Sequence, residues 1–424
     1  MIKRRDGFTL TELMITMVIF VLVIAAASNI FSGLVTQFKQ QSKIAETNIE
    51  GIAGLELMRF DIEQAGYGLP WNVDANGDGF ADADWTNLAN YKEAVSTGSP
   101  DPANYNDADD ATGTGGNAPR AIVCDNNVGY NNSDYLVIKA TNIATNDTAQ
   151  KWTYIANAGS NNTLMTQFGS SAEDLVDGER VIVTIPSKDD SQKILLTDDT
   201  SGSRKFFASF DTDLTTFTNN YADLVPFANS YQTHLIYGVD DNTDLRMPFN
   251  RADFFIERPS SIPSQCAPNT GVLYKTTVNH KDGKLSYFPL LDCVADMQIT
   301  FRLDMNDDGT AATISDANGT TINNTTEGVL PANVQETLNN AALIRQRLKE
   351  IRVYILAHEG QKDATYTFNN FTGMATCPTC ITVGNAAADD NAALTKDFDL
   401  SIIPEFRNYR WKVYSMSIIP YNLR

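Results

Sequence analysis

Histidine, cysteine and tryptophan are scarce in this 424-residue sequence, which contains three, five and four of them. A metal site or a catalytic triad based on histidine therefore has little material. The G-x-S-x-G motif of serine hydrolases is absent from the sequence. A glycosidase needs only two carboxylates, so the 52 acidic residues of this chain neither indicate nor exclude that activity. Since no feature points to catalysis, we predict that the protein is not an enzyme.

Basic residues are also in deficit, with 32 Lys and Arg against 52 Asp and Glu and a net charge of −20. An acidic surface repels phosphate backbones, which argues against nucleic acid as a partner. The same surface attracts cations and favours solubility outside the cytoplasm. Asn, Asp, Thr and Gly are abundant between short apolar runs, a pattern typical of many turns that join short strands.

The N-terminus contains the one long apolar run of the chain. Three basic residues at positions 3 to 5 come first, and the 21 residues from Phe8 to Ser28 suffice for a helix across a bilayer about 30 Å thick. Positive charge before the span predicts a cytoplasmic N-terminus and an exported remainder. Glu12 lies at the edge of the apolar run, where a carboxylate needs a partner.

The segment GFTLTE at residues 7–12, followed directly by the apolar run, resembles the class III signal of the type IV pilin superfamily. The resemblance implies cleavage between Gly7 and Phe8 by prepilin peptidase, which makes 1–7 a leader peptide, and N-methylation of Phe8. It also implies that Glu12, fifth in the mature chain, pairs with the N-terminal ammonium of a neighbouring subunit during assembly. Within one helix, Phe8 and Glu12 are i and i+4 neighbours as well.

Two other interpretations of the N-terminus stay open. One is a secretory signal peptide with an A-x-A cleavage site at 25–27, and the other is a plain membrane anchor. A signal peptide needs neither the Gly–Phe pair nor Glu12 at this offset. The helical pattern also continues past Ser28 to Val35, which favours the pilin-like signal.

The helical pattern extends to about Gly66, where Gly66, Gly68 and Pro70 supply a stop. We predict a transmembrane or filament-core half at 8–35 and an amphipathic half at 36–68. Apolar residues recur every three or four positions and predict one apolar face, formed by Ala45, Ile49, Ile52, Leu55, Met58, Ile62 and Ala65.

Residues 69–424 are expected to form an exported, β-rich globular domain. The predicted fold class is α+β, with a long N-terminal transmembrane and amphipathic helix followed by a mainly antiparallel pilin-like domain with large loops. Polar loops are expected at 96–119, 197–232 and 364–396, and a second helix at 331–349. Strands are expected at 134–140, 152–155, 180–185, 193–196, 234–237, 252–257, 272–276, 294–303, 350–358 and 410–420.

The segment DIEQAGY at 61–67 resembles the end of the long helix in PilW-type minor pilins, as does a closing strand with a basic terminus. The resemblance implies a minor pilin that assembles with other minor pilins and the major pilin, through the inner-membrane machinery. It also implies a role in priming the pilus and a place at its tip. Two alternatives stay open: a GspJ-like pseudopilin of a type II secretion system, and a secreted or membrane-anchored calcium-dependent adhesin.

Two acidic segments have oxygen-bearing residues at every second position, as calcium-binding loops do. The first has Gly79 at position 6 but Trp85 instead of a bidentate Glu at position 12, so a plain turn fits it equally well. A weaker copy, Asp304, Asn306 and Asp308, follows the longest expected strand, where a strand-ending turn is favoured. The candidate ligands of the first loop are Asp74, Asn76, Asp78, Phe80 through its carbonyl, Asp82 and Asp84.

Five cysteines in an exported chain predict disulfides with one cysteine left over. Cys377 and Cys380 are expected to form a structural bridge, because their flanks lack the helix start of a redox site. Cys266 and Cys293 lie 27 positions apart around an expected hairpin, and their bridge would add about 3 kcal/mol of stability. Cys124 is then the unpaired cysteine.

Overall fold

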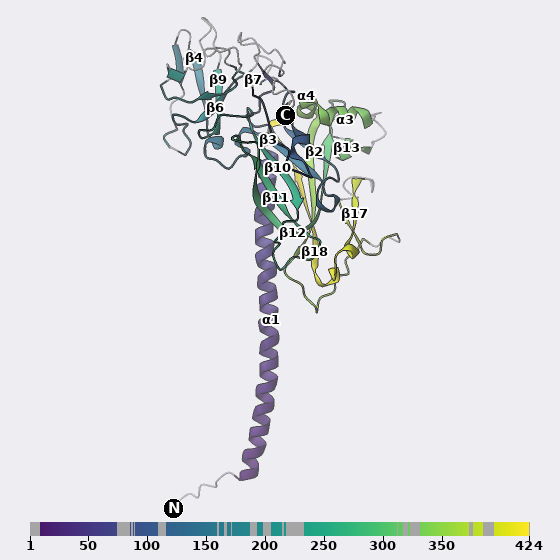
Figure 1. Ribbon diagram of the computed structural model, residues 1–424. Helices are drawn as coiled ribbons and strands as arrows, with labels where there is room; N and C mark the ends of the chain where they lie inside the picture. Colours follow the sequence, from purple (N-terminus) through teal and green to yellow (C-terminus); the bar gives the residue numbers. More distant parts are fainter. Residues whose placement is uncertain are drawn as a thin grey trace, which may run out of the picture.

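The computed structural model consists of one long helix, α1 (Leu10–Glu63), and a β-rich domain built on two sheets (Figure 1). The predicted α+β class and the mainly antiparallel character of the domain are confirmed. The structure describes residues 9–73, 85, 88, 90–108, 116–158, 161–164, 168–170, 172–186, 193–197, 205–213, 216–217, 233–311, 313–316, 321–322, 331–372, 376–384 and 394–423.

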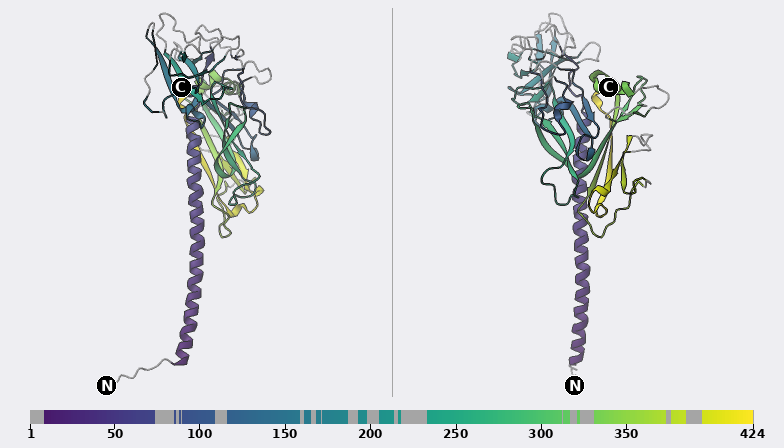
Figure 2. Two further views of the ribbon diagram at one scale, coloured as in Figure 1. Left: turned by 60° about the vertical axis from the view of Figure 1, so that its left-hand side comes forward. Right: turned by 45° about the vertical axis from the view of Figure 1, so that its right-hand side comes forward.

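Helix α1 begins at the cap residue Thr9 and ends at Gln64, close to the predicted stop. Gly66 and Gly68 have φ angles of +80° and +63°, which glycine adopts without the strain that other residues meet. After the helix, the chain therefore turns sharply into the domain at these two positions. Figure 2 shows from two further sides that the first part of α1 extends away from the domain and only its last part lies against it.

The larger sheet is antiparallel, and the second half of α1 packs on one of its faces, chiefly against β12. A short ladder of two strands, β13 (Thr313–Asp316) and β14 (Thr321–Ile322), continues beside the end of β12. The main strands, in spatial order, are β2 (Ile122–Asp125), β3 (Tyr135–Ala140), β10 (Asn250–Glu257), β11 (Gly271–Val278), β12 (Leu285–Leu303), β15 (Leu348–Glu359) and β18 (Arg410–Ile418).

The smaller sheet forms a lobe at the end of the domain far from the N-terminus (Figure 1). All but the first of its strands come from the chain between β3 and β10, which are neighbours in the larger sheet. Its strands are β1 (Asn72–Val73), β7 (Lys193–Leu195), β6 (Arg180–Pro186), β9 (Thr233–Asp240), β4 (Trp152–Ala158) and β5 (Asn161–Leu164), with β8 (Ala208–Ser209) beside β6.

One apolar core joins the two sheets. Ile182, Leu195 and Val239 of the smaller sheet belong to the same buried cluster as Leu136 and Ile299 of the larger one. A second buried cluster lies within the smaller sheet, around Val181, Val183 and Ile236. The lobe is therefore an insertion that shares part of its core with the sheet it interrupts.

The expected helix at 331–349 is corrected to two helices, α3 (Pro331–Asn339) and α4 (Ala341–Arg347). Asn340 separates them, because its side-chain oxygen accepts hydrogen bonds from the backbone N–H groups of Ala342 (2.9 Å) and Leu343 (3.1 Å). Such an N-cap starts a new helix instead of continuing the old one. Strand β15 then begins at Leu348.

The expected loops also contain regular structure. In the expected loop at 364–396, β16 (Cys380–Val383) pairs with β17 (Lys396–Asp399). Strand β8 lies in the expected insertion 197–232, most of which is outside the described residues. In the expected polar loop 96–119, a 3-10 turn at Pro102–Tyr105 is partly buried.

The buried face of α1 differs from the predicted one. Leu55, Met58, Ile62 and Ala65 are buried as expected, but Ala45, Ile49 and Ile52 are exposed. The helix already contacts the domain at Thr47, whose hydroxyl accepts from the Gly360 N–H at 3.0 Å, but its fully buried face begins at Gly51. Close approach there depends on glycine, because a Cβ at Gly54 would lie 1.9 Å from the backbone oxygen of Leu290.

This contact predicts opposite effects for two glycine substitutions in the same helix. Gly54→Ala forces the helix away from β12 and should lower the free energy of unfolding by about 1–3 kcal/mol, the usual range for an overpacked core. Gly33→Ala should have no such effect, since a Cβ at that position would meet no atom within 4 Å beyond the helix's own local backbone. Urea unfolding of both full-length variants in detergent measures the difference; equal stabilities would contradict the docking described here.

Candidate functional site

Glu12 and Thr9 together cap the N-terminus of α1. The backbone N–H of Glu12 donates to Thr9 Oγ1 (3.3 Å), and its carboxylate oxygen Oε2 accepts from the Thr9 N–H (3.0 Å) and the Thr9 hydroxyl (2.9 Å). This reciprocal arrangement is a capping box. Glu12 therefore stabilises the helix start within its own chain, and its exposed carboxylate stays accessible to a second partner.

The first half of α1 has the properties of a membrane-spanning helix. Its most apolar 18-residue window has a mean hydropathy of 2.5, and the rest of the chain buries none of it. Its hydroxyl groups bond to its own backbone: Thr16 to the Leu13 carbonyl (3.0 Å) and Ser32 to the Ser28 carbonyl (2.9 Å). Hydrocarbon offers no partners to polar groups, so this internal satisfaction suits membrane anchoring.

The predicted cleavage site, Gly7 and Phe8, lies outside the described residues, and so does the acidic loop Asp74–Asp84. The second acidic loop is described and forms a turn directly after β12. The backbone N–H groups of Asp308 (3.2 Å) and Gly309 (2.9 Å) donate to the Asp304 carboxylate. The Asn306 amide donates to Asp308 Oδ2 at 3.0 Å.

A turn accounts for these hydrogen bonds without a metal, in line with the strand-ending turn that the sequence analysis favoured. Asp304, Asn306 and Asp308 lie together there, but three side chains fall short of the six to eight oxygens that Ca²⁺ requires. Calcium binding at this loop stays a prediction.

Both expected disulfides are present. The bridge between Cys266 and Cys293 joins the segment before β11 to β12, at a bulge where Cys293 has a φ angle of +59°. The bridge between Cys377 and Cys380 closes the turn before β16. Both tie loops to strands of the domain. Neither lies at the N-terminus of a described helix, where a redox-active thiol would be expected.

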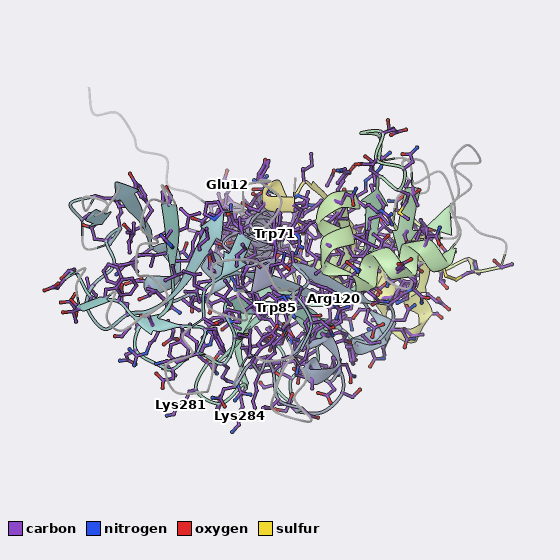
Figure 3. The ribbon with its side chains drawn as sticks, turned by 90° about the horizontal axis from the view of Figure 1, so that it is seen from above. Glu12, Trp71, Trp85, Arg120, Lys281 and Lys284 are labelled. Carbon is purple, nitrogen blue, oxygen red and sulfur yellow. A yellow bond between two sulfur atoms is a disulfide. The ribbon has the colours of Figure 1, made fainter. Side chains whose placement is uncertain are left out.

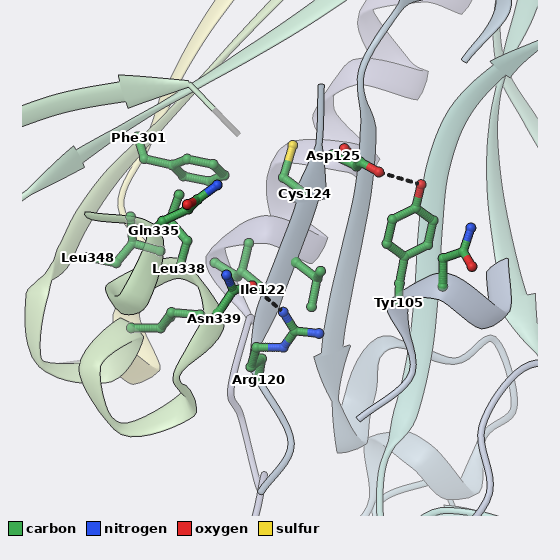
Figure 4. A pocket seen from close by; sticks show the side chains of 13 residues that line it. Tyr105, Arg120, Ile122, Cys124, Asp125, Phe301, Gln335, Leu338, Asn339 and Leu348 are labelled. Carbon is green, nitrogen blue, oxygen red and sulfur yellow. Dashed lines mark hydrogen bonds between the residues drawn. The ribbon is translucent and has the colours of Figure 1, made fainter. Parts of the chain in front are cut away.

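Cys124, the unpaired cysteine, lines a cavity of about 220 Å³ between β2 and helices α3 and α4 (Figure 4). Phe301 and Leu338 contribute apolar walls, and Arg120 lies at one side, where its Nη1 donates to the Asn339 side chain at 3.3 Å. Burial raises the pKa of the Cys124 thiol well above its usual value, and nearby aspartates add to the effect. The thiol therefore stays protonated and unreactive near neutral pH.

The three histidines are buried in structural positions. The Arg246 N–H donates to Nδ1 of His280 at 3.2 Å, and the Ala267 N–H donates to Nε2 of His358 at 2.8 Å. Burial lowers the pKa of His280, His358 and His234 to about 4. All three are therefore neutral at physiological pH. That the protein is not an enzyme stays a prediction.

A buried cluster of charged residues was missed by the sequence analysis. Lys139 of β3 is completely buried, and its ammonium lies 2.7 Å from Glu93 and 2.6 Å from Asp107. Arg251 of β10, also completely buried, contacts Glu93 at 3.1 Å and Asp253 at 2.7 Å. The two cations thus join the segment before β2 to two strands of the larger sheet.

A half-buried arginine and a buried tyrosine complete this cluster. Arg120 contacts Asp107 at 2.6 Å, and the Tyr135 hydroxyl donates to Asp253 at 2.6 Å. A signal was present in the sequence, because Lys139 interrupts the apolar strand DYLVIKA and Arg251 and Asp253 share one face of β10. The identity of the distant partners, Glu93 and Asp107, was not visible there. The cluster stabilises the domain that α1 carries.

Comparison with known proteins gives one match. A family model described as the prokaryotic N-terminal methylation motif matches residues 2–28, which include the GFTLTE segment and the apolar run. No curated protein and no solved structure matches the chain. The match agrees with the exposed apolar helix and its capped start, and it does not extend to the β-rich domain.

Proposed function

We propose that this type IV pilin-like protein, so indicated by its N-terminal methylation motif, is a minor pilin that assembles with other minor pilins and primes the type IV pilus. One observation supports this most: α1 has an apolar, unburied first half with a capped acidic start, while its second half carries a folded domain. The first half would be stored in the inner membrane and then packed among other helices. The domain would lie in the periplasm before assembly.

The size of the domain favours a subunit present in few copies. Helices packed in a bundle lie only about 8–10 Å apart, so each subunit along a shaft has limited lateral room. Here one helix carries a nine-stranded sheet and a seven-stranded lobe that extends to the far end of the domain (Figure 1). Such a domain fits best at an end of the filament, and we propose the pilus tip.

A pseudopilus of a type II secretion system is the second candidate, because it uses the same kind of N-terminal helix. A deletion strain separates the two. The pilus proposal predicts loss of surface filaments and, after complementation, this protein in sheared filaments at far fewer copies than the major pilin. Normal filaments with blocked protein secretion would favour the pseudopilin, and a deletion without either defect would contradict both.

Calcium remains a proposed ligand of the Asp74–Asp84 loop, as in a calcium-dependent adhesin. A carboxylate cluster in a chain of net charge −20 attracts divalent cations. Calcium should then raise the melting temperature of the full-length protein, and a chelator should reverse the rise. Asp78→Asn should abolish the shift, whereas Asp282→Asn, at an exposed position outside both acidic loops, should preserve it.

A further inference from the structure

Two cations contact the same indole ring where the smaller sheet meets helix α4. The guanidinium carbon of Arg345, on α4, lies 4.5 Å from the centre of the Trp71 ring, and the ammonium of Lys193, on β7, lies 5.9 Å from it. The backbone N–H of Trp71 donates to the carbonyl of Lys193 at 2.8 Å, which fixes the two segments together. Figure 3 shows Trp71 beside α4, seen from the end of the molecule opposite to the N-terminus.

The polar groups of this cluster lack acceptors. Nη1 of Arg345 and Nε1 of Trp71 are buried, and neither has a hydrogen-bond partner in the part of the chain that the structure describes. Among the described residues, neither Lys193 nor Arg345 forms an ion pair. The completely buried cations Lys139 and Arg251, by contrast, do have carboxylate partners.

The lack of a counter-charge among the described residues has an energetic consequence. Burial lowers the pKa of Lys193, and the nearby Arg345 lowers it further; burial also lowers the pKa of Arg345 to about 10. Keeping both side chains charged in this partly buried position therefore costs free energy. An anion between them would remove much of that cost. Water can accept the hydrogen bonds but cannot neutralise the charge.

We propose that Trp71, Lys193 and Arg345 form a binding site for a carboxylate. A carboxylate is planar and accepts two parallel hydrogen bonds from a guanidinium, and the indole N–H supplies a further donor. Lys193 adds a point charge. The site is at the end of the molecule opposite to the membrane helix, so its carboxylate would come from outside: a small organic acid or an acidic side chain of another protein.

Calorimetric titration tests the site with the full-length protein in nonionic detergent, with sodium malonate as probe and ionic strength held constant with chloride. One malonate per chain should bind. Arg345→Met and Lys193→Met should each weaken binding about tenfold to a hundredfold, the range for a charge-assisted hydrogen bond. Trp71→Phe keeps the ring and loses the donor, so it should weaken binding about threefold to tenfold. A hexapeptide of alternating glycine and aspartate tests a polypeptide source of the carboxylate.

Lys281→Met is the matched control, because it removes one positive charge from an exposed position away from Trp71 (Figure 3). It should leave malonate affinity unchanged. Without malonate, Arg345→Met should melt at the same or a higher temperature than the wild type, since it removes an unpaired half-buried cation. No detectable malonate binding, or equal weakening by Lys281→Met and Arg345→Met, would overturn the proposal.

Discussion

A Glu12→Ala chain is expected to insert into the inner membrane at the wild-type level and to fall at least about tenfold in sheared filaments. Insertion depends on the apolar run and the basic residues before it, which this change leaves in place. Incorporation depends, in our proposal, on a charge pair between Glu12 and the N-terminal ammonium of a neighbouring subunit. Loss of a buried pair at an interface costs about 2–5 kcal/mol, which exceeds a tenfold change in affinity. Immunoblots of membrane and filament fractions measure both quantities.

Two further variants separate the charge of Glu12 from its role in the helix cap. Glu12→Gln keeps a side chain that can accept hydrogen bonds from Thr9, but it has no charge, so incorporation should still fall. Thr9→Ala removes the hydroxyl of the capping box and leaves the charge, so incorporation should be largely retained. Normal incorporation of Glu12→Gln would show that capping, not charge, is what assembly needs.

A Lys139→Met chain is expected to lose about 3–5 kcal/mol of unfolding free energy. The substitution fills the space but leaves Glu93 and Asp107 facing each other without the ammonium that lies between them. Breaking one side of a buried charge pair is costly for that reason. Urea unfolding of the full-length protein, followed by circular dichroism, measures the loss. Lys412→Met is the control, because Lys412 pairs with Glu359 at the surface and should contribute only about 0–1 kcal/mol.

The same cluster predicts how stability depends on acid. Burial alone would raise the pKa of Asp107, but Lys139 and Arg120 lower it below its usual value. Asp107 therefore adds stability above the unfolded-state pKa of about 3.9, and this contribution is lost as the pH falls through the lowered native pKa. In Lys139→Met this acid-dependent loss should shrink. An unchanged unfolding free energy in Lys139→Met would mean that the cluster is not a structural centre of the domain.

The sequence predicted those parts of the fold that local patterns determine. The apolar run, the stop at Gly66 and Gly68 and most long strands depend on periodicity and on backbone conformation within a few residues. Strand β12 was expected only from Val294, where the strict alternation begins, but it starts at Leu285. The break at Asn340 was missed since an asparagine at that position fits both a helix interior and a cap.

The rest of the fold depends on distant partners. Ala45, Ile49 and Ile52 continue the apolar pattern of α1, but nothing in that pattern tells which side of the helix the domain covers. Likewise, Lys193 and Arg345 are ordinary basic residues in their own segments. Only folding brings both to Trp71. The sequence thus predicted the long N-terminal helix and the position of Glu12 at its start, and could not predict the buried charge cluster or the two cations at Trp71.

The mature N-terminus is the measurement that tests the central claim most directly. Mass spectrometry of the protein from native membranes and from sheared filaments identifies the first residue and its modification. A chain that begins with N-methylated Phe8 is predicted, because the methylation motif at 2–28 implies removal of the leader and retention of the apolar helix. A chain that begins at Ser28 would contradict the account, since the helix that defines it as pilin-like would then be discarded.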